Sequence, residues 1–317
     1  MTKASPKNVA ASVRQRLQNL ARERKEDFQL ALSRYALERL LHRIGQSPHR
    51  DRFVVKGAML FHLWTDQIYR PTRDIDFLAH GDHSVTHLES IFREVCNQAV
   101  EDDGLLFESE SVSGSIIKPD QEYQGVRVAL QAKLERARIP VQIDIGFGDV
   151  ITPAAQQVQY PSMLGFPTPV VSTYPRETVV AEKFQAMVML GMANSRMKDF
   201  FDLWLLSVTF EFDGDVLARA IQATFERRRT PLPETIPTAL SADFYDDDSK
   251  QKQWKAFISK GGLATTPPLP DLIAGLRAFL LPPVEAMWTG QGFQKRWCPP
   301  GPWRSLDGGT EAHPPSC

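Results

Sequence analysis

The stretch FVVKGAMLFHLWTDQIYRPTRDIDFL, residues 53–78, decides the fold because it holds two strand signals with a helix between them. The opening FVV is a short apolar strand that ends at Lys56 and Gly57, and residues 59–64 then begin a helix. The second strand, residues 74–78, alternates carboxylates with apolar side chains. Since side chains i and i+2 of a strand point to the same face, Asp74 and Asp76 project together.

Two carboxylates that leave a sheet side by side suit Mg²⁺ or Mn²⁺, since hard cations prefer oxygen ligands and the phosphates of a substrate. Gly57 lets the backbone approach a triphosphate, and the N-terminus of the helix that follows favours the negative charge of that group. Lys56, Gly57 and Ala58 are therefore candidate nucleotide-binding residues. A DxD pair is also common at solvated strand ends, so the preceding strand, Lys-Gly turn and helix are needed to favour a metal site.

A third carboxylate, Asp144, lies in the otherwise apolar strand 141–145. Alternation puts it on the same face as Gln142, and an unpaired carboxylate there would be costly. Two interpretations fit this position equally well. Asp144 is either a further metal ligand on a neighbouring strand or a strand-end residue that faces solvent or caps the turn before Gly146. Arg73 is similarly open, because it either touches a substrate phosphate or merely flanks the strand.

The remaining pattern mixes strands with helices, some strands being adjacent and hairpin-like, which predicts an α+β fold. Strands are expected near residues 125–132 and 140–145, and helices over residues 9–44 and 85–100. From residue 174 the chain turns helical, with Pro175 at the first helical position. The basic residues of segment 9–44 are expected on a solvated helix face, paired with Glu23, Glu26 and Glu38. They are Arg14, Arg16, Arg22, Arg24, Lys25, Arg34, Arg39 and Arg43.

Two charged positions in the helical half point to chemistry. Lys183 sits one position from an apolar stripe, where its ammonium either reaches over a cleft toward a phosphate or snorkels to solvent. Asp199 and Asp202 share a mostly buried helix face, and buried carboxylates need cationic partners. The candidate partners are Arg196, Lys198 and Lys183. Asp202 is interpreted as structural.

The bulk composition is that of an ordinary globular protein, with 317 residues that are 42% hydrophobic and 24% charged. The net charge of -1 means that any contact with nucleic acid must come from a local basic surface. No apolar run approaches the ~18 residues that span a bilayer, and residues 1–17 lack the apolar core of a signal peptide. Three cysteines make no disulfide framework. These features predict a cytoplasmic protein without membrane contact.

The C-terminal segment has a different composition from the rest. Residues 282–317 hold seven prolines and five glycines, one third of the segment, which is typical of disorder. Trp288, Trp297 and Trp303 are unusual there, but no periodic apolar face accompanies them. We therefore expect residues 283–317 to form a disordered tail.

Three separated motifs together resemble the AbiEii/AbiGii toxin family of polymerase-β-type nucleotidyltransferases. Residues 53–82 are similar to its first motif, VQIDIGFGDVITP (141–153) to its third-carboxylate strand, and residues 174–206 to its AEK and KD-x-x-D helices. The resemblance runs over residues 31–207 in the expected order. It implies a nucleotidyltransferase core over residues 51–170, preceded by helices (1–50) and followed by a helical domain that completes the active site (171–282).

Position by position, the resemblance implies metal carboxylates at Asp74 and Asp76, an essential lysine at Lys183 and an essential aspartate at Asp199. Ala58 departs from the wider superfamily, which has Gly or Ser there, so only backbone contacts to phosphate are expected from it. The resemblance also implies an NTP substrate, an RNA acceptor such as the 3′ end of tRNA, and a winged-helix antitoxin as genetic partner. A small-molecule or protein acceptor, a silent nucleotide- or RNA-binding protein and a DxD glycosyltransferase are the alternatives.

Overall fold

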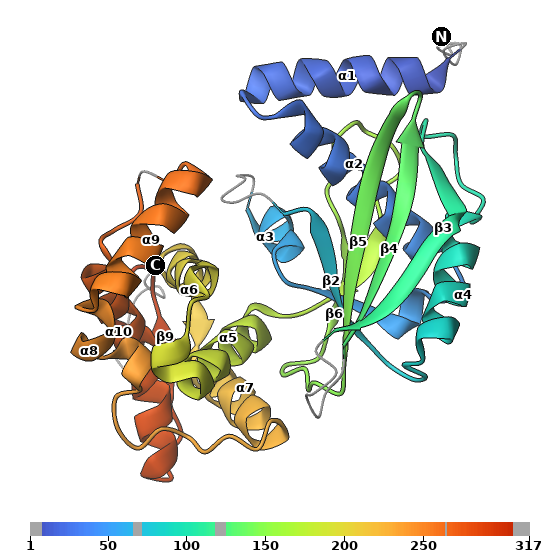
Figure 1. Cartoon of the computed structure of the whole chain (residues 1–317). Helices are drawn as coiled ribbons and strands as arrows, with labels where there is room; N and C mark the ends of the chain where they lie inside the picture. Colours follow the sequence, from blue (N-terminus) through green and yellow to red (C-terminus); the bar gives the residue numbers. More distant parts are fainter. Residues whose placement is uncertain (1–7, 66–71, 118–124, 264, 307–317) are drawn as a thin grey trace, which may run out of the picture. The chain divides into compact units, whose positions relative to one another are not determined.

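The chain divides into two compact units (Figure 1). The computed structural model describes residues 8–65, 72–117, 125–263 and 265–306. Met1–Gly148 and Ala155–Tyr174 form the first unit, here called the sheet unit. Asp149–Ala154 and Pro175–Cys317 form the second, called the helical unit. Each unit has its own buried core, so each is described by itself.

A mixed sheet forms the centre of the sheet unit. Within the described residues its seven strands run in the order β3-β4-β5-β2-β1-β7-β6. The β1–β7 and β2–β5 pairs are parallel and the other pairs antiparallel, so the expected α+β fold with a mixed sheet is confirmed. The strands are β1 (Phe53–Lys56), β2 (Asp74–Ala79), β3 (Leu106–Ile117), β4 (Gly125–Leu134), β5 (Ala137–Phe147), β6 (Gln156–Gln159) and β7 (Val170–Thr173).

Helices α2 and α4 pack on this sheet, and α3 follows β1 directly. The segment expected as one helical region is two helices, separated where Lys25 adopts a left-handed conformation (φ 53°) and Asp27 caps the amide of Leu30 at 3.0 Å. Helix α2 is buried along most of its length, which places it inside the unit. The helices are α1 (Val9–Arg24), α2 (Phe28–Gln46), α3 (Met59–Trp64) and α4 (Val85–Cys96), with the 3-10 turn η1 (Arg50–Arg52).

The basic residues of α2 do not form the solvated face expected from the sequence. Arg39 and Arg43 are buried, and both bind the buried carboxylate of Asp103: Arg39 Nε lies 2.9 Å and Arg43 Nη1 2.7 Å from Oδ2. Burial by itself raises the pKa of Asp103, but the hydrogen bond and charge of Arg43, with hydrogen bonds from Arg39 and the Leu105 amide, together outweigh it and hold that pKa below its ordinary value. The expectation failed for these two residues because Asp103, distant in sequence, supplies the charge that lets both guanidinium groups enter the core. The basic residues of α1 are exposed, as expected.

The helical unit is built from α-helices and a small antiparallel sheet of order β10-β9-β8. Pro175 is the residue before α5 rather than its first helical residue, and residues 230–248 include a 3-10 turn and a short helix. No helix in the described ranges combines the length and apolar character that crossing a bilayer requires. The larger elements are α5 (Arg176–Leu190), α6 (Met197–Thr209), α7 (Gly214–Arg227), α8 (Ala242–Tyr245), α9 (Asp248–Gly261), α10 (Leu269–Trp288), β8 (Phe212–Asp213), β9 (Lys295–Trp297) and β10 (Trp303–Ser305).

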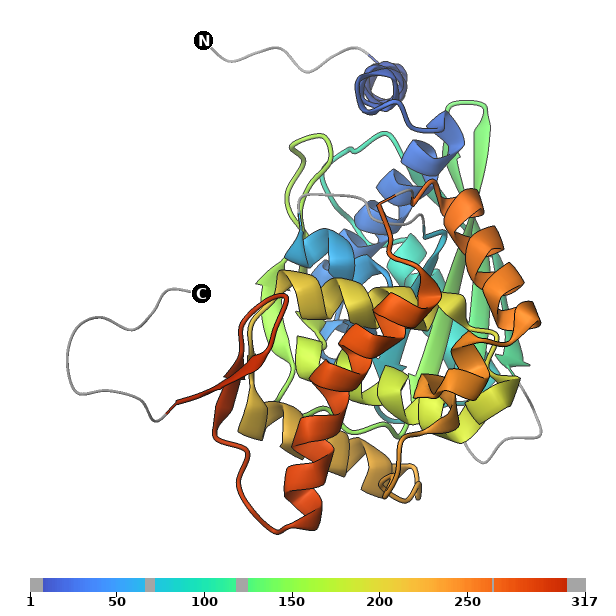
Figure 2. The ribbon, with the colours of Figure 1, turned by 90° about the vertical axis from the view of Figure 1, so that its left-hand side faces the viewer.

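The expectation of a disordered tail is wrong for residues 283–306; residues 307–317 lie outside the described part. Helix α10 continues to Trp288, and β9 and β10 follow as an antiparallel pair, in dark red in Figure 2. Trp297 is 2% exposed and donates to Ser207 O at 2.6 Å, while Trp303 stacks on Phe279. The tryptophans bury enough apolar area to order a segment rich in proline and glycine, which composition alone did not show.

Replacing Trp297 by alanine is therefore expected to lower the free energy of unfolding by about 3–5 kcal/mol, because it empties a large site in a packed core. Trp288, which is 52% exposed, is the matched control, and Trp288→Ala should cost well under half as much. Thermal melting of the two variants beside the unmodified chain checks this. Equal melting temperatures for both variants would contradict the packing of Trp297 described here.

Candidate active site

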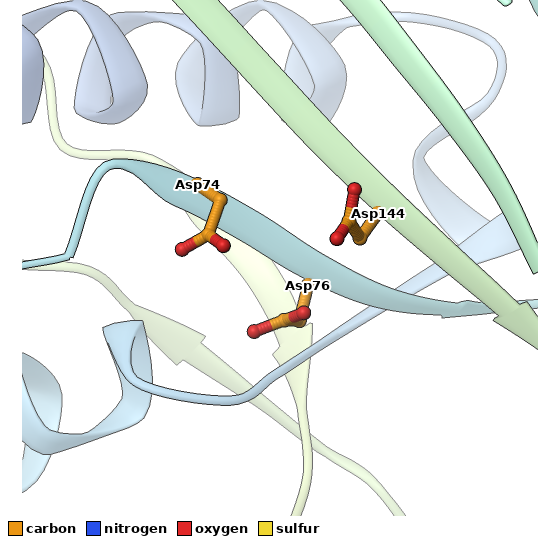
Figure 3. A group of neighbouring side chains, drawn as sticks. All are labelled: Asp74, Asp76 and Asp144. Carbon is orange, nitrogen blue, oxygen red and sulfur yellow. The ribbon is translucent and has the colours of Figure 1, made fainter. Parts of the chain in front are cut away.

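Three carboxylates gather on one face of the sheet (Figure 3). Asp74 and Asp76 lie on β2 and Asp144 on β5, and one oxygen from each lies within 4.8 Å of the others. The strands are parallel neighbours, with Asp76 opposite Asp144 and Asp74 opposite Gln142. Alternation on two strands in this register sends all three carboxylates to the same side, as the sequence predicts for each strand separately.

The opposite face of the same strands fixes that register. Ile75 and Phe77 of β2, and Ile143 and Ile145 of β5, are all buried. A slip of one residue would exchange the faces and carry the carboxylates into the apolar core. The core on one side of the sheet thus determines where the carboxylates stand on the other.

Gly57 is required by the close approach of the backbone to Asp76. Its φ of +72° is one that residues with a side chain adopt rarely. A Cβ at this position would lie 2.0 Å from Oδ2 of Asp76, well inside contact distance. The adjacent Ala58 is buried and precedes α3. The turn that the sequence predicts to approach phosphate therefore lies directly against a carboxylate of the cluster.

Asp74 is held by a residue that sequence analysis missed. The buried Thr72 donates its hydroxyl to Asp74 Oδ1 at 2.7 Å. A hydroxyl two positions before a strand carboxylate is an ordinary signal for such a local bond, and it could have been found from the sequence. Arg73, between these two residues, is exposed, and its role stays a prediction.

Asp144 has a partner that neither sequence interpretation included. Arg127, opposite it on β4, binds it through both oxygens: Nε to Oδ1 and Nη2 to Oδ2, each at 2.7 Å. The hydrogen bond to Asp144, then the charges of Asp144, Asp74 and Asp76, raise the pKa of the Arg127 guanidinium. Gln142, with its amide oxygen turned to the guanidinium, lies 3.1 Å from Nη2. Asp144 is thus a partly exposed carboxylate paired with a guanidinium, and not a cap of the turn before Gly146.

Arg127, Asp144, Asp76 and Lys56 stand opposite one another on four adjacent strands, β4, β5, β2 and β1. We call this set the charged row. Lys56 extends over the ring of Tyr174, with Nζ 5.6 Å from its centroid. The row places a cation on each side of two carboxylates.

A second cluster lies in the helical unit and joins the two residues that the resemblance marks as essential. Lys183 Nζ on α5 lies 2.7 Å from Asp199 Oδ1 and 2.9 Å from Asp202 Oδ2, both on α6. Arg196 Nε lies 2.7 Å from the other oxygen of Asp199. The aspartates are 1% exposed and the lysine side chain 13%. Two of the three expected cationic partners are found, and Lys183 does not snorkel to solvent.

The residues of the first cluster fit a divalent metal ion. Mg²⁺ binds oxygen ligands at about 2.0–2.1 Å. The carboxylate oxygens lie within 4.8 Å of one another, so a small rotation of the side chains brings them onto one ion. The donors are all carboxylate oxygens, which suit Mg²⁺ and Mn²⁺ better than Zn²⁺. Asp74, Asp76 and Asp144 are the residues that would hold it.

A mixed sheet with paired carboxylates beside a glycine turn, followed by helices, is the framework of a nucleotidyltransferase. The family model described as nucleotidyl transferase AbiEii toxin, type IV toxin–antitoxin system, matches residues 39–286, well over half of the chain. The chain therefore belongs to the AbiEii nucleotidyltransferase toxin family, which confirms the resemblance stated from residues 31–207.

Two crystal structures are among those that the chain resembles. A candidate nucleotidyltransferase from H. pylori is 15% identical, with a TM-score of 0.49 over 83% of this chain and 98% of that one. JHP933 from Helicobacter pylori is also 15% identical, with a TM-score of 0.48 over 83% of this chain and 94% of that one. Among curated proteins, none matches this chain in sequence.

The contact between Gly57 and Asp76 predicts that Gly57→Ala weakens Mn²⁺ binding by about tenfold or more, because the new methyl group displaces a candidate ligand. Gly81 is the matched control: its φ is +94°, but no atom lies within 4 Å of the position a Cβ would take. Gly81→Ala should cost roughly 1 kcal/mol of stability through backbone strain and leave Mn²⁺ binding unchanged. Titration calorimetry would measure both, and equal binding by both variants would contradict the role given to Gly57.

The two clusters should respond oppositely to the loss of a charge. Lys183→Ala leaves two buried carboxylates without their shared cation, so we expect the free energy of unfolding to fall by about 3 kcal/mol. Asp76→Ala removes repulsion among neighbouring carboxylates and should leave the melting temperature unchanged or raised. Lys255→Ala, at an exposed position of α9, is the control for losing a lysine. A Lys183 variant as stable as the Lys255 variant would show that the buried pair contributes little.

Proposed function

We propose that this nucleotidyltransferase moves a nucleoside monophosphate from an NTP to the 3′ hydroxyl of RNA, with tRNA as the first candidate acceptor. The reaction would require Mg²⁺ or Mn²⁺. The observation that carries the proposal is the cluster of Asp74, Asp76 and Asp144 within 4.8 Å beside the turn at Gly57. Three carboxylates this close repel a triphosphate as well as one another, so substrate binding calls for a bound cation.

The residues of the sheet unit have separate roles in this proposal. Asp74, Asp76 and Asp144 would hold the cation, which would supply charge neutralisation for the triphosphate and lower the pKa of the attacking hydroxyl. The backbone at Gly57 and Ala58 contacts the phosphates, and Lys56 and Arg73 supply positive charge. In the transfer, the acceptor hydroxyl releases its proton to solvent and its oxygen forms a bond to the α-phosphorus, the bond from that phosphorus to the oxygen bridging to the β-phosphate breaks, and pyrophosphate leaves with the electron pair of that bond.

Lys183 and Asp199 have a linked role. The carboxylates of Asp199 and Asp202 hold the lysine ammonium in one place, which supports Lys183 as a contact to phosphate and Asp199 as the residue that positions it. Both carboxylates are almost completely buried, so they reach substrate only through the lysine. Lys183 and Asp199, the essential pair implied by the resemblance, then act together.

The biological setting follows from the family. We propose that the protein acts in the cytoplasm as the toxin of a type IV system associated with abortive infection, and that a winged-helix antitoxin counteracts it. Expression of the chain should then arrest growth, whereas expression of Asp76→Asn should not. Co-expression of a cognate winged-helix antitoxin should restore growth, and failure to restore it would remove that protein as the partner.

The reaction is tested by incubating the purified chain with total bacterial RNA and each NTP labelled in turn at the α-phosphate. We expect label on RNA from at least one NTP, with MgCl₂ required, EDTA abolishing transfer and excess pyrophosphate slowing it. A γ-labelled NTP should give no label, since the β- and γ-phosphates leave together. Asp76→Asn, purified in parallel, should be inactive because it loses a metal ligand without changing side-chain size.

Each other outcome points to a stated alternative. Transfer of the γ-label would indicate a kinase. Labelling that survives a blocked RNA 3′ end would keep the chemistry and remove that hydroxyl as the acceptor. Label on protein or on a small molecule in place of RNA would reassign the acceptor class. No labelling with any NTP would favour a silent nucleotide-binding protein.

A further inference from the structure

The carboxylate of Asp144 already holds a cation of the protein itself. Arg127 binds both of its oxygens at 2.7 Å in the parallel, two-bond geometry that makes guanidinium–carboxylate pairs strong. The Asp144 side chain is 19% exposed, so the pair is only partly screened by water. Arg127 is one end of the charged row, and nothing in the sequence motifs of the site includes it.

The other carboxylates of the cluster are held differently. Asp74 accepts a hydrogen bond from the neutral hydroxyl of Thr72, and this contact does not neutralise the charge of Asp74. A carboxylate oxygen has two acceptor positions, and Arg127 takes one on each oxygen of Asp144. Any cation that ligates Asp144 must therefore share this carboxylate with the guanidinium charge or displace it.

We propose that Arg127 is a positioning residue that acts as a resident counter-ion: it holds Asp144 in place in the metal-free cluster and competes with the divalent cation for that carboxylate. The inference rests on the proposed metal-dependent function and deepens it. Arg127 neutralises one of three carboxylates that lie within 4.8 Å of one another, which reduces the repulsion among them. This competition weakens the affinity of the cluster for the free cation. A cation bound to a triphosphate is therefore favoured over a cation without nucleotide.

The chain offers a matched control for this role. Arg93 and Glu89 on α4 form a pair whose side chains are 43% and 21% exposed, against 43% and 19% for Arg127 and Asp144. Glu89 belongs to no cluster of carboxylates found among the described residues. A change at Arg93 therefore removes an ion pair of equal exposure from the same unit without touching the candidate metal site.

The test is the affinity of the full chain for Mn²⁺ without nucleotide, measured by electron paramagnetic resonance of the free ion. Arg127→Gln should bind Mn²⁺ about fivefold more tightly than the unmodified chain, the ratio that corresponds to about 1 kcal/mol. Arg93→Gln should bind unchanged. Arg127→Lys should fall between, because lysine keeps the charge without the two-bond geometry. Melting curves confirm that each variant is folded, and Arg127→Lys carries the test if Arg127→Gln is not.

A double-mutant cycle separates this role from a general effect of charge. In an Asp144→Asn background the substitution Arg127→Gln should change Mn²⁺ affinity much less than fivefold, since the competition acts through that carboxylate. The same substitution should also matter less once a non-hydrolysable NTP analogue is present. A full effect in the Asn background would show that Arg127 acts on the cluster at a distance and would overturn the proposal.

Failure of the inference and failure of the proposed function give different results. If Asp76→Asn loses Mn²⁺ binding while Arg127→Gln binds no more tightly than the unmodified chain, the metal site stands and the counter-ion role is wrong. Weaker binding by Arg127→Gln would show that the arginine assists the metal, which also overturns the inference. If Asp76→Asn binds as well as the unmodified chain, the cluster is not the metal site and both proposals fail.

Discussion

Repulsion among three carboxylates within 4.8 Å of one another is the constraint around which the sheet unit is arranged. Unit charges at such separations interact by roughly 1 kcal/mol in water and by several times more at the effective dielectric of a protein surface. Two features oppose that repulsion. The apolar faces of β2 and β5 fix the register that brings the carboxylates together. In the charged row, Arg127 and Lys56 flank Asp144 and Asp76. The helices behind the sheet secure that register by burying its apolar face.

The helical unit handles charge in the opposite way. Lys183 and Arg196 match Asp199 and Asp202 one for one, and the aspartates lie in the core. Such a cluster is rigid because each group would be costly to bury alone. The sheet unit thus presents a cluster with excess negative charge, which can bind a cation. The helical unit instead holds the ammonium of Lys183 in place with buried carboxylates. Under the proposed function, the first cluster would hold the metal and Lys183 of the second would contact the phosphates of the nucleotide.

Local pattern was enough to predict much of this. Alternation and the Lys-Gly turn located β1, α3 and β2, and alternation in 141–145 put Asp144 on the correct face. What the sequence could not supply was pairing between distant segments. Arg127 lies 17 residues before Asp144, and only the register of β4 on β5 brings them together. Arg39 and Arg43 looked like surface residues because their partner, Asp103, is 60 or more residues away. The prediction of a disordered C-terminal segment failed for the same reason, because the site in the core that Trp297 fills is formed by other elements.

That last feature has a consequence for how the protein is made. Because β9 joins β8, and Trp297 reaches back 90 positions to Ser207 of α6, the core of the helical unit is closed by residues translated well after that helix. Domains emerging from the ribosome fold from the N-terminal side onward, so the unit that carries Lys183 must wait for this closing segment. A polypeptide released early, before residue 293, would carry every motif of the family and yet lack a finished core around the second cluster. Under the proposed function, activity would then depend on residues that lie outside all of these motifs.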